Sequence, residues 1–197
     1  MMEEKSVLAS TKEKQQIIQL IVFRVGDEEF GVPINAVQEI IKIGNITPIP
    51  DSPDFIRGLI NVRGDIVAII DVRARFSLPT EEEPSKHIVI VKQEGNLFGL
   101  MVNEVMEVLR IQESDIKAPP QLMAKIQEDY VYGVITHDSR LIILLDVTKV
   151  LSEDELIRLA SLTHQKQNKN SFEEETLGES KLTKKKNNTD LTDRKKT

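Results

Sequence analysis

The chain of 197 residues contains no cysteine and no tryptophan, and only three of its residues are histidines. The absence of cysteine excludes disulfide bonds and thiolate metal sites. His87, His137 and His164 are widely separated, and none has the spacing of a zinc-binding motif. We therefore expect no metal site and no cofactor.

Long apolar runs are also absent. No run approaches the roughly 20 residues that a helix needs to span a bilayer. The N-terminal stretch MMEEKSVLASTKEKQQ lacks the apolar segment of a secretory signal. We expect a cytoplasmic protein without direct membrane insertion.

Positive charge is scarce over most of the chain. Residues 164–197 hold nine Lys or Arg and six Asp or Glu, which leaves 17 basic against 26 acidic residues in positions 1–163. Proteins that bind nucleic acid depend on clustered basic charge to contact phosphates. The sequence therefore argues against a nucleic-acid partner.

Motifs of enzymatic chemistry are missing as well. No Walker pattern and no dinucleotide fingerprint occurs. His137, Asp138 and Ser139 are triad residue types, but a working triad joins separated elements, and we interpret these neighbours as a hairpin turn. Asp71 and Asp146 end predicted strands, where bonds to the backbone are the expected role. We expect no catalytic residue, so the protein is not predicted to be an enzyme.

An internal repeat is the most informative feature of the sequence. Residues 20–41 match residues 88–109 without a gap, and residues 55–76 match residues 130–151 in the same way. The paired positions include Phe30 and Phe98, Asn35 and Asn103, Val37 and Val105, Glu39 and Glu107, Gly58 and Gly133, and Asp71 and Asp146. Each half of the chain is therefore expected to form the same small unit.

The local pattern of each half predicts strands. Runs such as LIVF, IVIV, DIVAII and RLIILL are rich in β-branched residues and are bounded by short turn signals. Prolines gather at 47–53 and 117–122, where they mark strand ends because proline cannot donate to a central ladder. The prediction is a mostly β fold of two tandem small β-barrels.

A short helix is predicted at the end of the folded part, over 152–162. Ser152 and Glu155 have capping-box spacing, and Leu156, Leu159 and Ala160 fall on one face that would dock on a barrel. Residues 163–197 contain too few apolar side chains to offset the entropy of ordering. We predict a disordered charged tail there and a flexible N-terminus over 1–16.

The repeat and the segment RGLINVRGDIVAIIDVRARF together resemble the family of chemotaxis coupling proteins, CheW. The resemblance covers roughly residues 17–162. Its strongest part is Arg57–Phe76, where Gly58, Asn61, Arg63, Gly64 and Asp71 fall in the family pattern. Two departures are Ala68, where the family usually has proline and where we expect only an altered strand edge, and the long tail.

The resemblance implies two intertwined SH3-like barrels of five strands each, about 17–80 and 81–151. It implies a non-enzymatic scaffold, without a cofactor, that couples methyl-accepting chemoreceptors to the histidine kinase CheA. The signalling tips of the receptors would lie in a groove between the barrels, and the regulatory domain of the kinase would dock barrel against barrel. The protein would then be recruited to receptor arrays at the inner face of the membrane.

The resemblance also implies a receptor-binding surface, whereas it leaves the kinase-binding residues unassigned. The positions carried over to this chain are Val37, Glu39, Arg63, Ile88, Val105 and Val108. Core packing is the alternative role for the four aliphatic residues. For Glu39 and Arg63 it is an exposed ion pair, worth about 0–1 kcal/mol.

Two other functions stay open at this point. The same fold could serve another receptor–kinase system, such as one that controls surface motility. A ligand-binding or hydrolytic β-barrel would instead need convergent polar groups, and the sequence shows none.

The predicted disorder of the tail has a direct test. Truncation after Thr163 should leave the thermal midpoint almost unchanged, because the removed residues bury no core. Thermal melts of the full and truncated chains measure this. A midpoint lowered by many degrees, or slow amide exchange within 170–197, would contradict the prediction.

Overall fold

The computed structural model describes residues 16–79, 84–93, 95–119, 130–159 and 161. Within this part, ten strands dominate. They are β1 (Ile17–Val25), β2 (Glu28–Pro33), β3 (Val37–Lys42), β4 (Ile56–Val62), β5 (Asp65–Asp71), β6 (His87–Gln93), β7 (Asn96–Val102), β8 (Glu104–Gln112), β9 (Val131–His137) and β10 (Arg140–Leu145). The short helices are η1 (Ile34–Ala36), α1 (Val72–Arg75) and η2 (Glu113–Asp115), and a C-terminal helix begins at Glu153.

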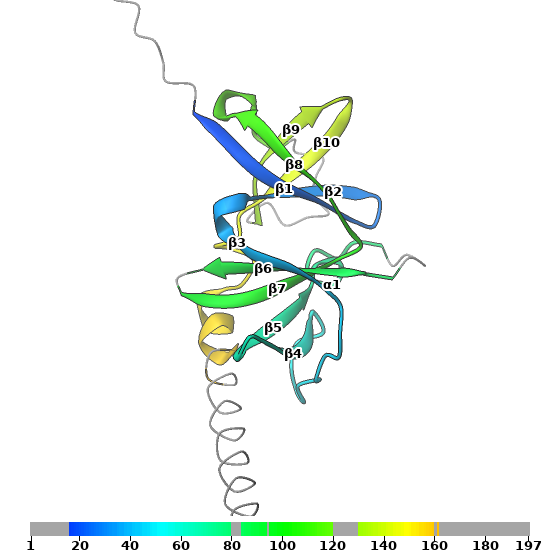
Figure 1. Cartoon of the computed structure of the whole chain (residues 1–197), viewed down its shortest axis with the longest axis vertical. Helices are drawn as coiled ribbons and strands as arrows, with labels where there is room; N and C mark the ends of the chain where they lie inside the picture. The colour runs from blue at the N-terminus through cyan, green and yellow to red at the C-terminus, as the bar shows by residue number, and fades with distance from the viewer. Residues whose placement is uncertain (1–15, 80–83, 94, 120–129, 160, 162–197) are drawn as a thin grey trace, which may run out of the picture.

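The strands form two five-stranded SH3-like barrels, stacked one above the other in Figure 1. The first barrel has the strand order β8-β1-β2-β10-β9, and the second has the order β3-β6-β7-β5-β4. Neighbouring strands are antiparallel except for β2 with β10 and β5 with β7. The predicted mostly β fold is confirmed.

The two barrels exchange their N-terminal hairpins, so that the strands of each barrel come from both halves of the chain. The hairpin of β1 and β2 belongs to the first half of the sequence but pairs with β8 and β10 of the second half. In the same way β6 and β7 pair with β3 and β5. A boundary near 80/81 therefore separates the two repeats, whereas each barrel contains strands from both.

Three groups of buried side chains hold the fold together. One fills the first barrel around Leu20, Leu109 and Ile142, and another fills the second barrel around Ile69 and Ile90. The largest lies between the two sheets, and we call it the shared core. It includes Ile21, Phe23, Phe30, Ile70, Phe76, Val89, Val91, Phe98, Leu100, Ile143 and Leu145.

These three cores explain the continuous apolar runs of the sequence. Residues 20–23 and 88–91 are all buried, since one face of β1 and β6 lies inside a barrel and the other faces the shared core. Strands that are buried on both faces do not need alternating polar residues. The rings of Phe23, Phe30 and Phe76 follow one another at 6.1 and 5.9 Å across the shared core.

Several local predictions are confirmed. Asp71 accepts the amide hydrogens of Arg73 and Ala74 at the start of α1, and Asp146 accepts that of Thr148. Ser152 and Glu155 form the predicted capping box, with distances of 2.8 and 3.3 Å. Leu156 and Leu159 pack against the shared core, while Ala160 lies outside the described residues.

The expected effect of Ala68 was wrong. Ala68 pairs with Leu59 of β4 on one side and with Phe98 of β7 on the other, so β5 is an interior strand rather than an edge. The side chain is buried. The predictions for the tail at 163–197 and for residues 1–15 fall outside the described part of the chain.

Across the described ranges there is no helix that is long and apolar enough to cross a membrane. The same residues bring together no group of three or more metal-ligating side chains.

Gly58 closes the second barrel and provides a test of this packing. Its φ is +142°, and a Cβ atom there would lie 2.2 Å from the carbonyl oxygen of Thr47, which exchanges two main-chain hydrogen bonds with Leu59. Gly58→Ala should therefore lower the free energy of unfolding by about 2 kcal/mol or more.

Gly44→Ala is the matched control, since nothing lies within 4 Å of its added Cβ. Chemical denaturation of both variants should separate them clearly. Equal stability of Gly58→Ala and the parent chain would mean that the loop at Thr47 does not close the barrel as described.

Candidate binding surfaces

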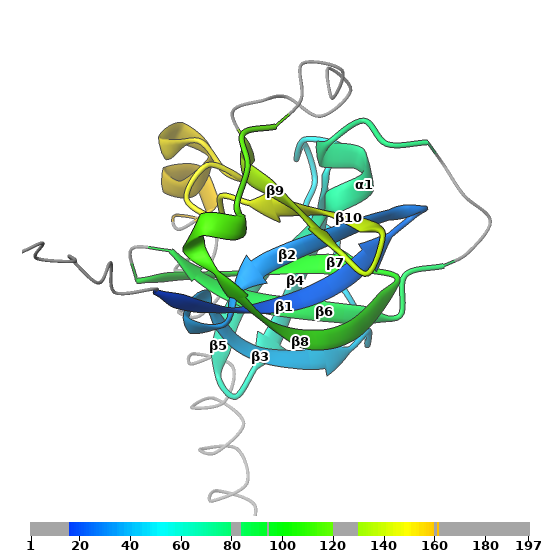
Figure 2. The same ribbon diagram turned by 90° about the horizontal axis from the view of Figure 1, so that it is seen from above.

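Strands β3 and β8 carry four of the six predicted receptor-binding residues. Val37 and Glu39 lie on β3, and Val105 and Val108 lie on β8. The two strands belong to different barrels and hold equivalent positions in the repeat. Figure 2 shows them along the same side of the molecule, so one face combines both repeats.

The aliphatic candidates differ in exposure. Val108 is 52% exposed and can contact a partner directly. Val37 and Val105 are partly buried against the shared core, so each offers only part of its side chain. Ile88 is 0% exposed inside the second barrel, where it packs with Ile69 and Ile90. Its assignment to an exposed surface was wrong, because a side chain within the barrel cannot reach a partner.

Arg63 and Glu39 form an ion pair, which the sequence analysis gave as the alternative to receptor binding for these two residues. The Arg63 Nη2 atom lies 3.1 Å from Glu39 Oε2, with the arginine side chain 80% exposed and the glutamate 20% exposed. Arg63 occupies the tip of the β4–β5 hairpin at φ +55°, and Asn61 accepts the amide hydrogen of Gly64 there. Because β3 and β4 are the two edge strands of their sheet, the pair joins them across the open side of the barrel.

The first barrel has a matching ion pair. Glu107, which is the repeat equivalent of Glu39, accepts from Arg140 Nη2 at 2.6 Å. Arg140 also lies 3.2 Å from Glu29 of β2. The hydrogen bond that Arg140 donates to Glu107 raises the pKa of Arg140 above its usual value. Each barrel therefore presents an arginine and a glutamate beside its exposed apolar residues.

Sequence reasoning missed two apolar residues of this face. Ile40 is 39% exposed on β3, and Met106 is 40% exposed on β8. Ile40 is the repeat equivalent of Val108, so the repeat alone could have identified it once Val108 was chosen. An exposed apolar side chain in each barrel is a typical feature of a protein-binding surface.

Arg75 organises a second surface, at the base of the C-terminal helix. Its guanidinium donates a bidentate pair of hydrogen bonds to the Glu155 carboxylate, at 3.1 and 3.0 Å. It also donates to the Val150 carbonyl at 2.8 Å. The same group lies 4.3 Å from the ring centroid of Phe55 and 4.9 Å from that of Tyr130. These contacts fix the helix against the second barrel.

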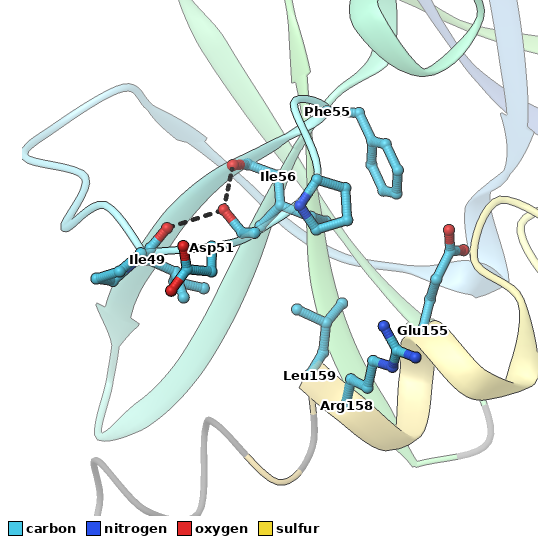
Figure 3. A pocket seen from close by; sticks show the side chains of 10 residues that line it. Ile49, Asp51, Phe55, Ile56, Glu155, Arg158 and Leu159 are labelled. Atoms are coloured by element: carbon cyan, nitrogen blue, oxygen red, sulfur yellow. Dashed lines mark hydrogen bonds between the residues drawn. The ribbon is translucent and has the colours of Figure 1, made fainter.

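A small pocket of about 110 Å³ opens between this helix and the loop before β4, as Figure 3 shows. Phe55, Ile56 and Leu159 line it, with Asp51 and Arg158 also at its walls. Ser52 steadies the loop by donating to the Ile49 carbonyl at 2.9 Å. The pocket has room for one apolar side chain.

The triad residue types are arranged as the sequence predicted. Asp138 and Ser139 form the turn between β9 and β10 with φ values of 48° and 64°, and His137 Nε2 lies 3.5 Å from Asp138 Oδ2. No hydrogen bond links His137 to Ser139 within the described chain.

Two like barrels that present apolar strands and ion pairs in this way define a protein-binding module.

Comparison with known proteins identifies the family. Residues 19–155 match the model of the CheW-like domain, and the chain belongs to this family. The chain is 33% identical over 149 residues to the chemotaxis protein CheW of Treponema pallidum, covering 73% of this chain and 88% of that protein. Protein FrzA of Myxococcus xanthus is 28% identical over 155 residues, covering 77% and 94%.

A solved structure is similar as well. The crystal structure of the scaffolding protein TtCheW from Thermoanaerobacter tengcongensis superimposes with a TM-score of 0.66 at 33% identity, covering 73% of this chain and 94% of that one. The expected family and its two-barrel fold are confirmed.

Proposed function

We propose that this protein is a non-enzymatic adaptor that couples methyl-accepting chemoreceptors to the histidine kinase CheA in bacterial chemotaxis. The observation that carries the proposal is the match of residues 19–155 to the CheW-like domain. The barrels support it physically, since their exposed features are apolar strands and ion pairs that suit protein contacts. The protein would act in the cytoplasm, recruited to receptor arrays at the inner face of the membrane.

The receptor would contact the face formed by β3 and β8. Val108 supplies exposed apolar area, Val37 and Val105 supply the partly buried base, and Ile40 extends the same surface. A receptor signalling tip made of two antiparallel helices would place apolar side chains on these residues. Glu39 and Arg63 would then lie at the rim, where charged groups fix the register of the partner.

Arg63 has the donors to bind a carboxylate or a helix C-terminus on the receptor. Among the described residues, Arg63 engages Glu39 through one nitrogen, at 3.1 Å, and a guanidinium carries five N–H groups. The kinase would dock through its regulatory domain, which resembles this fold, so that barrel packs on barrel. The residues of that contact are left unassigned.

A second candidate function keeps the adaptor and changes the pathway. The similarity to Protein FrzA is compatible with a CheW-like adaptor of another receptor–kinase system, such as one for surface motility. Identity to the chemotaxis protein of Treponema pallidum is higher, at 33% against 28%. Chemotaxis is therefore the preferred assignment.

The Arg63→Asp substitution tests the receptor-binding face. Aspartate accepts the left-handed backbone at this tip better than most residues, and surface changes usually alter stability by no more than about 0.5 kcal/mol. Loss of a desolvated charged contact at an interface costs about 2–5 kcal/mol. Calorimetric titration with a receptor signalling-tip fragment should therefore show affinity at least about thirtyfold lower, with an unchanged thermal melt.

Lys117→Asp is the matched control, because it makes the same reversal of charge at another exposed residue. Lys117 lies outside β3 and β8, among the residues that line a pocket at the end of the first barrel. It should bind the fragment as the parent chain does. Unchanged affinity of Arg63→Asp would remove this residue from the site.

A pull-down in which neither a CheA-type kinase nor a receptor fragment is retained by the parent chain would contradict the adaptor function itself.

A further inference from the structure

The first barrel contains a pocket of about 370 Å³ at the end where β1 begins and β10 ends. The side chains that matter for its chemistry are Ile18, Asn35, Glu113, Tyr132, Asp146 and Thr148. None of the six predicted receptor-binding residues lines it. Whatever binds there therefore binds to a different surface from the β3–β8 face.

The internal repeat shows what stands at the same place in the second barrel. Thr148 corresponds to Arg73, Asn35 to Asn103, and Tyr132 to Arg57. Arg73 Nη2 donates to Asn103 Oδ1 at 2.9 Å. In the second barrel the asparagine oxygen is thus satisfied by an arginine of the same chain together with the amide hydrogen of Gly26, which lies at 3.0 Å.

A second arginine stands near the aspartate of the second barrel. Arg57 Nε lies 4.0 Å from Asp71 Oδ2, and Asp71 is the repeat equivalent of Asp146. Both the asparagine and the aspartate of this barrel therefore have a guanidinium within reach.

The first barrel keeps the acceptors but lacks both arginines. Thr148 is too short to take the place of Arg73, and its hydroxyl bonds instead to Asp146 Oδ1 at 2.6 Å. Lys149 Nζ lies 3.6 Å from Asp146 Oδ2, but this lysine is a largely exposed neighbour in sequence. In the described part of the chain the Asn35 side chain makes no hydrogen bond, so its carbonyl oxygen can accept one.

The lining of the pocket suits a long cation. The charged side chains among its described lining residues, Glu113 and Asp146, are both acidic. Ile18 and Leu20 provide an apolar wall for an alkyl stem, and the exposed ring of Tyr132 can stack on a planar guanidinium. Arginine fits these groups better than lysine because it offers several donors in one plane.

We propose that this pocket binds an arginine side chain presented by a partner protein, in the place that Arg73 holds in the second barrel. The guanidinium donates to the Asn35 carbonyl and to the acidic groups, and its stem lies along Ile18 and Leu20. Arginine binding at this pocket is independent of the adaptor function, because none of the predicted receptor-binding residues lines the pocket.

The test is a nuclear magnetic resonance titration of the full chain with the peptide acetyl-Gly-Arg-Gly-amide. Saturable shifts are expected at Ile18, Tyr132, Thr148 and the side-chain amide of Asn35. The same peptide with citrulline, which keeps the shape and removes the charge, should bind about tenfold more weakly. Equal binding of the two peptides, or shifts spread over the acidic surface, would overturn the proposal.

Thr148→Arg provides the decisive variant, because it restores the arginine that the repeat has in the second barrel. The carbonyl of Thr148 is held by Gln93 Nε2 at 2.6 Å, and this main-chain contact survives the change. The peptide should bind at least tenfold more weakly. Thr136→Arg, the same change at an exposed position of β9 outside the pocket, should bind it normally.

Undiminished binding by Thr148→Arg would contradict the proposal. If that variant loses its dispersed spectrum, Asn35→Ala and Tyr132→Ala replace it, since both side chains are exposed. Each should weaken peptide binding about threefold or more. Unchanged affinity in both would equally overturn the assignment.

Discussion

The shared core between the two sheets is the constraint on which the rest of the structure depends. It exists because the first hairpin of each repeat pairs with the remaining strands of the other repeat. As a result, β1 and β6 are buried on both faces. A fully buried Phe contributes about 1.5–3 kcal/mol relative to an exposed one, and Phe23, Phe30 and Phe98 all lie in this core. The two barrels therefore fold as one body. Burial of the shared core, rather than a linker, fixes the position of one barrel relative to the other.

This fixed arrangement turns two small barrels into a protein-binding module. Val37 and Val105 pack on the shared core from opposite barrels, and each stands beside a glutamate that is paired with an arginine. The ion pairs are partly exposed and add little stability. They matter more as directional groups at the rim of an apolar face, where the polar groups of a partner can form hydrogen bonds with the arginine and glutamate side chains.

The sequence predicted the parts of the fold that local chemistry decides. The strands followed from apolar runs, the cap at Ser152 from its spacing to Glu155, and the roles of Asp71 and Asp146 from their place at strand ends. The exchange of hairpins could not be predicted in this way. A hairpin such as 17–33 has the same pattern whether it pairs with its own repeat or with the other, and only the long-range packing decides.

The candidate site was predictable to a similar extent. The repeat and the family resemblance predicted Val37, Val105 and Val108 as binding residues, and this stays a prediction, but an aliphatic residue on a strand has two possible faces. Ile88 therefore proved to lie inside the barrel, while Ile40 lies outside. Alternation along one strand does not determine which face is covered when both sides of the sheet have a core.

The most direct measurement of the central claim, that the exchanged hairpins make one inseparable body, is to split the chain in two. Residues 1–83 and 84–197 should each give an undispersed amide spectrum alone, because each half lacks the hairpin that completes its barrel. Mixed in equal amounts, they should assemble and give the dispersed spectrum of the intact chain. A half that folds alone into a stable barrel would contradict the claim.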